Sequence, residues 1–200
     1  MIKCLFTGQV NSGKSSLIMS LAKYNSNKQV LVSHAGSEEN HNVAYLEQEK
    51  VSHKAYTTDN ITHYIFLLGC KGKYYKYDMI DSVGLIDDAY DKPELRDSLW
   101  QLFYQLSKCD ILVHTINAYQ FNNNYGLNML DIEKEIIEYQ RKKNNKSIIC
   151  ATFADKKSAK KGVKLIRKAY PQIPVIALSN DNGLGVKRLN SLLTEYSYNY

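Results

Sequence analysis

The clearest chemical signal lies near the start of the chain, where GQVNSGKS occupies residues 8–15 between an apolar run and a helical pattern. This spacing, GxxxxGK[ST], suits a loop that wraps a diphosphate. Its glycines let successive backbone N–H groups point inward, and the following helix N-terminus adds partial positive charge. Lys14 can give a point charge to the β- and γ-phosphates, and Ser15 a hydroxyl to Mg²⁺. The alternative is a chance Gly-Lys-Ser turn, but the strand–loop–helix context predicts a phosphate-binding loop.

A second motif, DSVG, begins at Asp81 at the end of another apolar run. A carboxylate there can hold Mg²⁺ through water, and the Gly84 N–H can sense a γ-phosphate. Thr62 lies 19 residues earlier and is a candidate ligand of Mg²⁺ and, through its backbone, of the γ-phosphate. Thr57 and Thr58 compete for that role, and Thr62 can equally be an ordinary strand residue. Together the motifs predict a nucleoside triphosphate site with Mg²⁺.

With these motifs the sequence resembles the translation-factor-related P-loop GTPases, most of all the Era, MnmE and FeoB group. Those proteins often carry GxPNxGKSS, and this chain has GQVNSGKSS; the phrase CDILVHTINA also resembles one of their strands. The resemblance extends from Ile2 to about Tyr196 and implies one unpermuted G domain that binds GTP and GDP. The phosphate contacts that it implies are Gly8, Asn11, Ser12, Gly13, Lys14, Ser15 and Ser16, with Lys14, Thr62 and Gly84 serving catalysis and Ser15, Thr62 and Asp81 holding Mg²⁺.

Base recognition in that family uses [NT]KxD, and the matching stretch here is TFAD at residues 152–155. Asp155 would accept two hydrogen bonds from guanine, Thr152 fills the first position, and Phe153 replaces the usual lysine, where its ring can stack on the purine. Ser179 and Asn180 match the last motif, at which a backbone N–H meets the guanine oxygen. The alternatives are an Asp that caps the next helix and a simple Asn/Gly turn.

One residue expected to assist hydrolysis is missing. Leu85 occupies the position at which Ras-like proteins carry a Gln that positions the attacking water. The resemblance implies that a K⁺ ion, held by Asn11 beside the phosphates, can assist hydrolysis instead. It also implies a homodimer that forms in the transition state. The alternative is that Asn11 only stabilises the loop. We expect slow GTP hydrolysis by a molecular switch. A non-hydrolysing scaffold and a small kinase are the other hypotheses. None of the arginines lies in the switch loops; they are Arg96, Arg141, Arg167 and Arg188.

Short apolar runs alternate with helical patterns, which favours an α/β fold. The resemblance refines this to a three-layer G domain with a mostly parallel six-stranded sheet, in which a hairpin around GCKGK makes one strand antiparallel. The polar stretch 25–61 is expected to be a long first switch, with KQVLVSHAG as a short extra strand. The predicted strands are 2–7, 61–68, 74–81, 110–116, 147–152 and 174–179, and the predicted helices are 14–24, 94–107, 126–143, 158–169 and 184–196.

The chain has 200 residues, which suits a single domain over 1–200. No apolar run approaches the roughly 20 residues that span a bilayer, and the N-terminal apolar stretch is too short for a signal peptide. The four cysteines are scattered and form no CxxC pair, so they indicate reduced thiols in the cytoplasm.

The net charge of +6 is unevenly distributed. Residues 141–200 carry 13 basic and three acidic side chains, and seven of the basic ones lie within 156–168. This basic face is either an ordinary solvated helix surface or a docking surface for RNA, an anionic membrane or an acidic protein.

Overall fold

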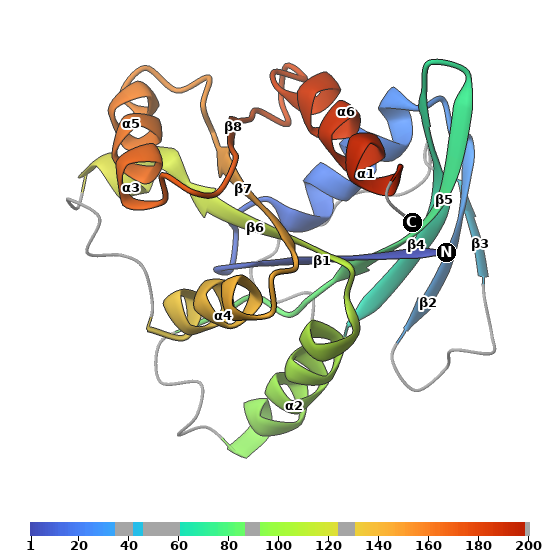
Figure 1. The fold of residues 1–200 in the computed structure, drawn as a ribbon, viewed down its shortest axis with the longest axis horizontal. Helices are drawn as coiled ribbons and strands as arrows, with labels where there is room; N and C mark the ends of the chain where they lie inside the picture. Colours follow the sequence, from blue (N-terminus) through green and yellow to red (C-terminus); the bar gives the residue numbers. More distant parts are fainter. Residues whose placement is uncertain (35–41, 46–60, 87–92, 124–130, 199–200) are drawn as a thin grey trace.

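A computed structural model describes residues 1–34, 42–45, 61–86, 93–123 and 131–198. One eight-stranded sheet runs through the molecule in the order β3-β2-β4-β5-β1-β6-β7-β8 (Figure 1). The strands are β1 (Ile2–Gly8), β2 (Gln29–His34), β3 (Asn42–Tyr45), β4 (Thr62–Cys70), β5 (Lys73–Asp81), β6 (Ile111–Asn117), β7 (Lys146–Thr152) and β8 (Val175–Ala177).

Six helices cover the two faces of this sheet within the described residues. On one face α1 and α6 pack over strand residues such as Cys4 and Phe6, while Leu5 turns to the opposite face, which the other helices cover. Figure 1 shows α1 and α6 on one side of β1, and α2 and α4 on the other. The helices are α1 (Lys14–Tyr24), α2 (Pro93–Lys108), α3 (Ala118–Asn123), α4 (Asp131–Lys142), α5 (Ala159–Ala169) and α6 (Val186–Ser197).

The predicted three-layer, mostly parallel α/β class is confirmed, but the sheet has eight strands where we expected six. β2 is the extra strand expected in KQVLVSHAG; it pairs antiparallel with β4 through Leu31 and Ile65, and β3 extends the same edge. Both β3 and β4 therefore oppose the other strands, not one strand alone. The polar composition of 25–60 hid β3, which has only four residues.

Most element boundaries fall within a few residues of their predicted positions. The hairpin turn is shorter than expected, because β4 and β5 pair through Cys70 and Lys73. Only Lys71 and Gly72 remain in the turn, both with positive φ (50° and 77°), as a two-residue type I′ turn requires. Sequence analysis missed α3, since six residues are too few to show a helical period. The first part of the predicted helix 126–143 lies outside the described residues.

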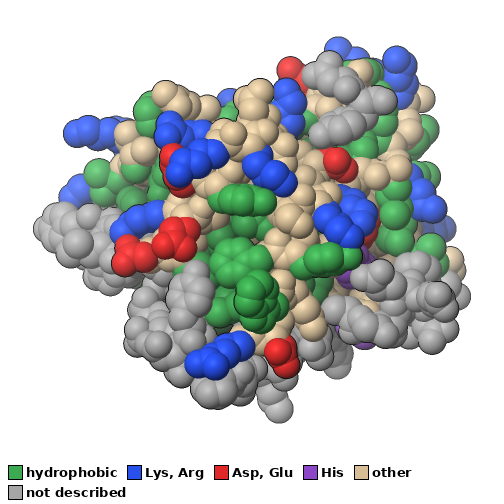
Figure 2. All heavy atoms as spheres, turned by 60° about the horizontal axis from the view of Figure 1, so that its bottom comes forward, with side chains coloured by type: hydrophobic (Ala, Val, Ile, Leu, Met, Phe, Trp, Pro, Cys, Tyr) green, Lys and Arg blue, Asp and Glu red, His purple; other side chains and the backbone are tan. Residues whose placement is uncertain are grey.

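The surface carries a basic face and a groove, both away from the strand ends that hold the predicted phosphate-binding loop. The basic face is on the outside of α5, where Lys160, Lys164 and Lys168 are exposed while Val163 and Ile166 are buried. A groove of about 830 Å³ lies between α2, α4 and residues 169–173. Figure 2, in which this side comes forward, shows apolar side chains near the middle of the view, with both basic and acidic side chains around them.

None of the described helices is both long and apolar enough to cross a bilayer. The described cysteines form no disulfide, and Cys4, Cys109 and Cys150 are buried. Burial raises the pKa of Cys4 and of Cys150, which favours the protonated thiol over the nucleophilic thiolate.

Candidate functional site

The predicted phosphate-binding loop connects the end of β1 to the start of α1. Gly8 ends the strand, and a Cβ there would lie 2.4 Å from the Thr115 carbonyl oxygen, so only glycine fits. Asn11 (φ 59°) and Gly13 (φ 92°) take the left-handed conformation that turns the loop back on itself. Asn11 is exposed on this loop, and Ser16 lies in the first turn of α1.

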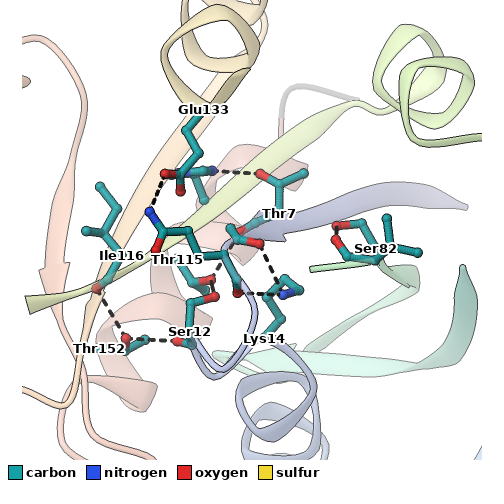
Figure 3. Close-up of polar contacts among 12 residues, drawn as sticks. Thr7, Ser12, Lys14, Ser82, Thr115, Ile116, Glu133 and Thr152 are labelled. Carbon is teal, nitrogen blue, oxygen red and sulfur yellow. Dashed lines mark hydrogen bonds and ion pairs between the residues drawn. The ribbon is translucent and has the colours of Figure 1, made fainter. Parts of the chain in front are cut away.

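Lys14 is 7% exposed, which is low for a cation. Its Nζ donates to the carbonyl oxygens of Gly8 (3.2 Å) and Gln9 (3.0 Å), inside the curve of the loop (Figure 3). Burial lowers the pKa of Lys14, while the carboxylates of Asp81 and Glu133 raise it in part. The lysine is thus a desolvated cation held by weak acceptors, which suits it to bind an anion.

Ser15 and Asp81 meet as the sequence predicts, because the parallel strands β1 and β5 end at the same edge of the sheet. The Ser15 hydroxyl donates to Asp81 Oδ2 at 2.5 Å. Burial raises the pKa of the Asp81 carboxyl, and Lys14 and Ser15 oppose that rise. Asp81 Oδ1 is buried and has no hydrogen-bond partner among the described residues. A hydroxyl beside a buried carboxylate with an unpaired oxygen fits Mg²⁺, which prefers oxygen ligands.

The DSVG segment runs directly against the phosphate-binding loop. Leu85 forms a parallel bridge with Gln9: its N–H donates to the Gly8 carbonyl (3.1 Å), and its carbonyl accepts from Val10 N–H (3.2 Å). A Cβ on Gly84 would lie 2.5 Å from Val10 Cγ2 and 2.8 Å from its Cα. Glycine is therefore needed for this close approach, which brings the Gly84 backbone to the loop.

The structure places Thr62 at the first position of β4, paired in register with Asp81. Thr62 is 6% exposed, and its hydroxyl lies 3.1 Å from His34 Nδ1. This is the ordinary strand position that we kept as an alternative, and the hydroxyl would have to leave His34 to bind a metal. The competing candidates Thr57 and Thr58 lie outside the described residues.

Neighbouring strands hold the phosphate-binding loop from behind (Figure 3). The Thr152 hydroxyl donates to the Ser12 carbonyl oxygen (2.8 Å), and Ser12 Oγ lies 2.6 Å from Thr115 Oγ1. Asn180 Nδ2 donates to the Gly13 carbonyl oxygen at 3.2 Å. Thr152 and Asn180, which the sequence assigned to the base, thus also fix the shape of the loop.

The two segments assigned to base recognition lie together. The Ala154 N–H donates to the Leu178 carbonyl (2.9 Å), and Lys156 Nζ lies 3.5 Å from Asp155 and 3.7 Å from Asp181. The Ser179 side chain holds the pKa of the Asp155 carboxyl below its usual value. Asp155 does not cap the next helix, because Ser158 is the N-cap of α5. Phe153, with φ 56°, is half-buried beside them.

Sequence analysis missed a buried polar group behind the loop. Gln9 Nε2 donates to Glu133 Oε2 (2.7 Å), and His114 Nε2 donates to Glu133 Oε1 (3.1 Å). The helical period could have indicated this burial, because Glu133 shares the helical face of the apolar residues Ile136 and Ile137.

No curated protein matches the chain. Among solved structures, the G domain of the T. maritima FeoB iron transporter is 23% identical (TM-score 0.62), with 98% of this chain and 99% of that one covered. Aquifex aeolicus Era bound to GDP·AlF₄⁻ is 17% identical (TM-score 0.66; 97% of this chain, 56% of that one), so the chain spans about half of Era. A probable GTP-binding protein EngB is 15% identical (TM-score 0.59; 99% of each chain).

These likenesses establish the fold, which is that of the P-loop GTPases. The family itself comes from a sequence model, described as 50S ribosome-binding GTPase, that matches residues 3–153. The matched range includes the phosphate-binding loop, the DSVG segment and Thr152. The chain therefore belongs to the 50S ribosome-binding GTPase family of P-loop GTPases.

Proposed function

We propose that the protein binds GTP and GDP with Mg²⁺ and slowly hydrolyses GTP to GDP and phosphate, as a molecular switch. The observation that carries the proposal is the placement of buried Lys14 beside the Ser15–Asp81 pair inside the loop. A cation and a metal-binding pair at one loop match what a Mg²⁺–triphosphate needs. Free thiols and a GTP substrate suit the cytoplasm, where we place this activity.

The proposal gives each residue of the site a role. Lys14 would neutralise the β- and γ-phosphates, and the Gly84 N–H would contact the γ-phosphate. Ser15 and, through water, Asp81 would hold Mg²⁺, and Thr62 would become a third ligand once its hydroxyl leaves His34. Water attacks the γ-phosphorus, a new P–O bond forms, and the bond to the β–γ bridging oxygen breaks so that GDP leaves.

We expect slow turnover because of Leu85, the residue directly after the DSVG motif. Leu85 is apolar and 2% exposed, so its side chain cannot orient the attacking water by a hydrogen bond. Asp155 would accept two hydrogen bonds from the guanine N1–H and N2–H groups, which adenine cannot offer. Phe153 would lie against the purine.

Fluorescent GTP, GDP and ATP titrations with and without Mg²⁺, combined with phosphate release, test the proposal. We expect GTP and GDP to bind in preference to ATP, with GTP binding dependent on Mg²⁺ and phosphate released slowly. Tight GTP binding without phosphate release would support the non-hydrolysing scaffold instead. A preference for ATP would overturn the role of Asp155.

Hydrolysis is expected to run roughly tenfold or more faster in KCl than in NaCl at equal ionic strength, because a cation beside the phosphates can stabilise the charge of the transition state. We assign that cation to Asn11, and Asn11→Ala should remove the difference between the salts. Equal wild-type hydrolysis rates in both salts would contradict a role for K⁺. Sedimentation with GDP and aluminium fluoride, in each salt, tests the accompanying homodimer.

The basic face on α5 is proposed as the docking surface of an acidic partner. Replacing Lys160, Lys164 and Lys168 with Gln should abolish salt-sensitive binding of a labelled polyglutamate peptide, because these ammonium groups are exposed and share one helix face. GTP affinity should not change. The matched control replaces three exposed lysines of the β4–β5 hairpin, Lys71, Lys73 and Lys76. Equal loss in both triple variants would show that only net charge matters.

A further inference from the structure

A line of buried polar side chains runs from α4 to the phosphate-binding loop (Figure 3). The Glu133 carboxylate accepts from Gln9 Nε2 at 2.7 Å and from His114 Nε2 at 3.1 Å. His114 Nδ1 lies 2.8 Å from the Thr7 hydroxyl, on the strand that leads into the loop. Glu133 and His114 are each only 1% exposed. The line thus joins α4, β6, β1 and the loop, and only its Gln9 end is partly exposed.

We propose that Glu133 is a positioning residue for the nucleotide site, acting on the phosphate-binding loop through the side chain of Gln9. The inference rests on the proposed nucleotide binding. Gln9 is a pivotal residue of the loop, because its carbonyl oxygen accepts from Lys14 Nζ (3.0 Å) and from the Ser12 N–H (3.1 Å). A side chain that fixes Gln9 therefore also fixes the main-chain acceptor of the phosphate-binding lysine.

Charge gives Glu133 a second effect on the same lysine. The nearby negative charges of Asp81 and Glu133 raise the pKa of Lys14, which burial lowers. Glu133 lies behind the loop on α4, whereas Asp81 ends β5 and forms the pair with Ser15. Glu133 thus favours the ammonium form of Lys14 without occupying the proposed Mg²⁺ position.

A purely structural role would be to tie α4 to the sheet, and another residue provides the comparison. Gln140 lies two turns further along α4, is fully buried, and donates to the Leu106 carbonyl oxygen at 2.8 Å. Both residues anchor the same helix through buried hydrogen bonds. Of these two residues, only Glu133 contacts the phosphate-binding loop. Comparing variants of the two therefore distinguishes an effect of anchoring the helix from an effect of positioning the site.

The experiment compares Glu133→Ala, Glu133→Gln and the matched control Gln140→Ala in the full chain, by thermal unfolding and by the Kd for fluorescent GDP. Both alanine variants should lower Tm, because each leaves buried donors or acceptors unpaired. Only Glu133→Ala should also weaken GDP binding, by roughly tenfold, through loss of a charged hydrogen-bond acceptor. Glu133→Gln keeps size and an acceptor but removes the charge, so its affinity should lie between those of Glu133→Ala and wild type.

A double-mutant cycle with Gln9→Ala tests the route. If Glu133 acts through Gln9, the double variant should lose little more GDP affinity than the more affected single variant. Fully additive losses, or equal GDP affinity in Glu133→Ala and Gln140→Ala, would overturn the inference while wild-type binding leaves the proposed function intact. Failure of the wild-type protein to bind GDP or GTP would instead overturn the proposed function, and this inference with it.

Discussion

Replacing Lys14 with methionine is expected to lower GTP and GDP affinity by at least about 100-fold, since each hydrogen bond from a charged group is worth about 1.5–3 kcal/mol. The same change should cost the nucleotide-free protein little stability at mildly acid pH. The ammonium group is desolvated, and an apolar side chain of similar length removes that penalty. Fluorescent-nucleotide titration and thermal unfolding measure the two effects separately.

The pH dependence of stability in the Lys14→Met variant follows from Asp81, which loses its nearby cation. Burial already raises the pKa of the Asp81 carboxyl, and without Lys14 that pKa rises further. A carboxyl with a raised folded-state pKa binds more protons in the native than in the unfolded state. Stability should therefore fall as pH rises from the ordinary Asp value of about 3.9 through the raised value, more steeply than in wild type.

Lys23→Met is the matched control, because Lys23 lies on the same helix and is exposed. It should leave nucleotide affinity unchanged and add no such pH dependence. If Lys14→Met bound GDP as tightly as Lys23→Met does, Lys14 would not be the phosphate-binding cation.

The core of the site could be predicted because local spacing and one topological rule suffice for it. Lys14 and Ser15 follow from the loop pattern, and Asp81 joins them because parallel strands β1 and β5 end at one edge of the sheet. The helix α1 begins and ends at its predicted residues. These features depend on near neighbours or on a regular sheet.

The remaining parts depend on contacts between residues far apart in the chain, which no periodicity encodes. Thr152 contacts the carbonyl oxygen of Ser12 across 140 residues, and Gln9 contacts Glu133 across 124. The strand β3 has four residues, too few for a convincing alternation. For Glu133, helical periodicity predicts that the side chain is buried, but it does not identify the hydrogen-bond donors that the carboxylate contacts.

Asp155→Asn is expected to lower GTP and GDP affinity by about 100-fold, because two charge-assisted hydrogen bonds to guanine are replaced by one neutral bond and one donor facing a donor. Affinity for xanthosine diphosphate should rise instead, since xanthine carries a carbonyl where guanine carries its amino group, and the asparagine amide can donate to it. Competition titrations with GDP, xanthosine diphosphate and ADP measure the exchange of specificity.

Asp181→Asn provides a close control for that exchange. Asp181 and Asp155 both lie near Lys156 Nζ, at 3.7 Å and 3.5 Å, so each variant removes one carboxylate from the same lysine. Only Asp155 matches the base-recognition motif, and only its replacement should change which base binds. If both variants lost GDP affinity equally and neither gained xanthosine diphosphate, the effect would come from Lys156 and local charge. Base selection would then have to be sought elsewhere, first at Asn180, whose side chain already contacts the Gly13 carbonyl of the phosphate-binding loop.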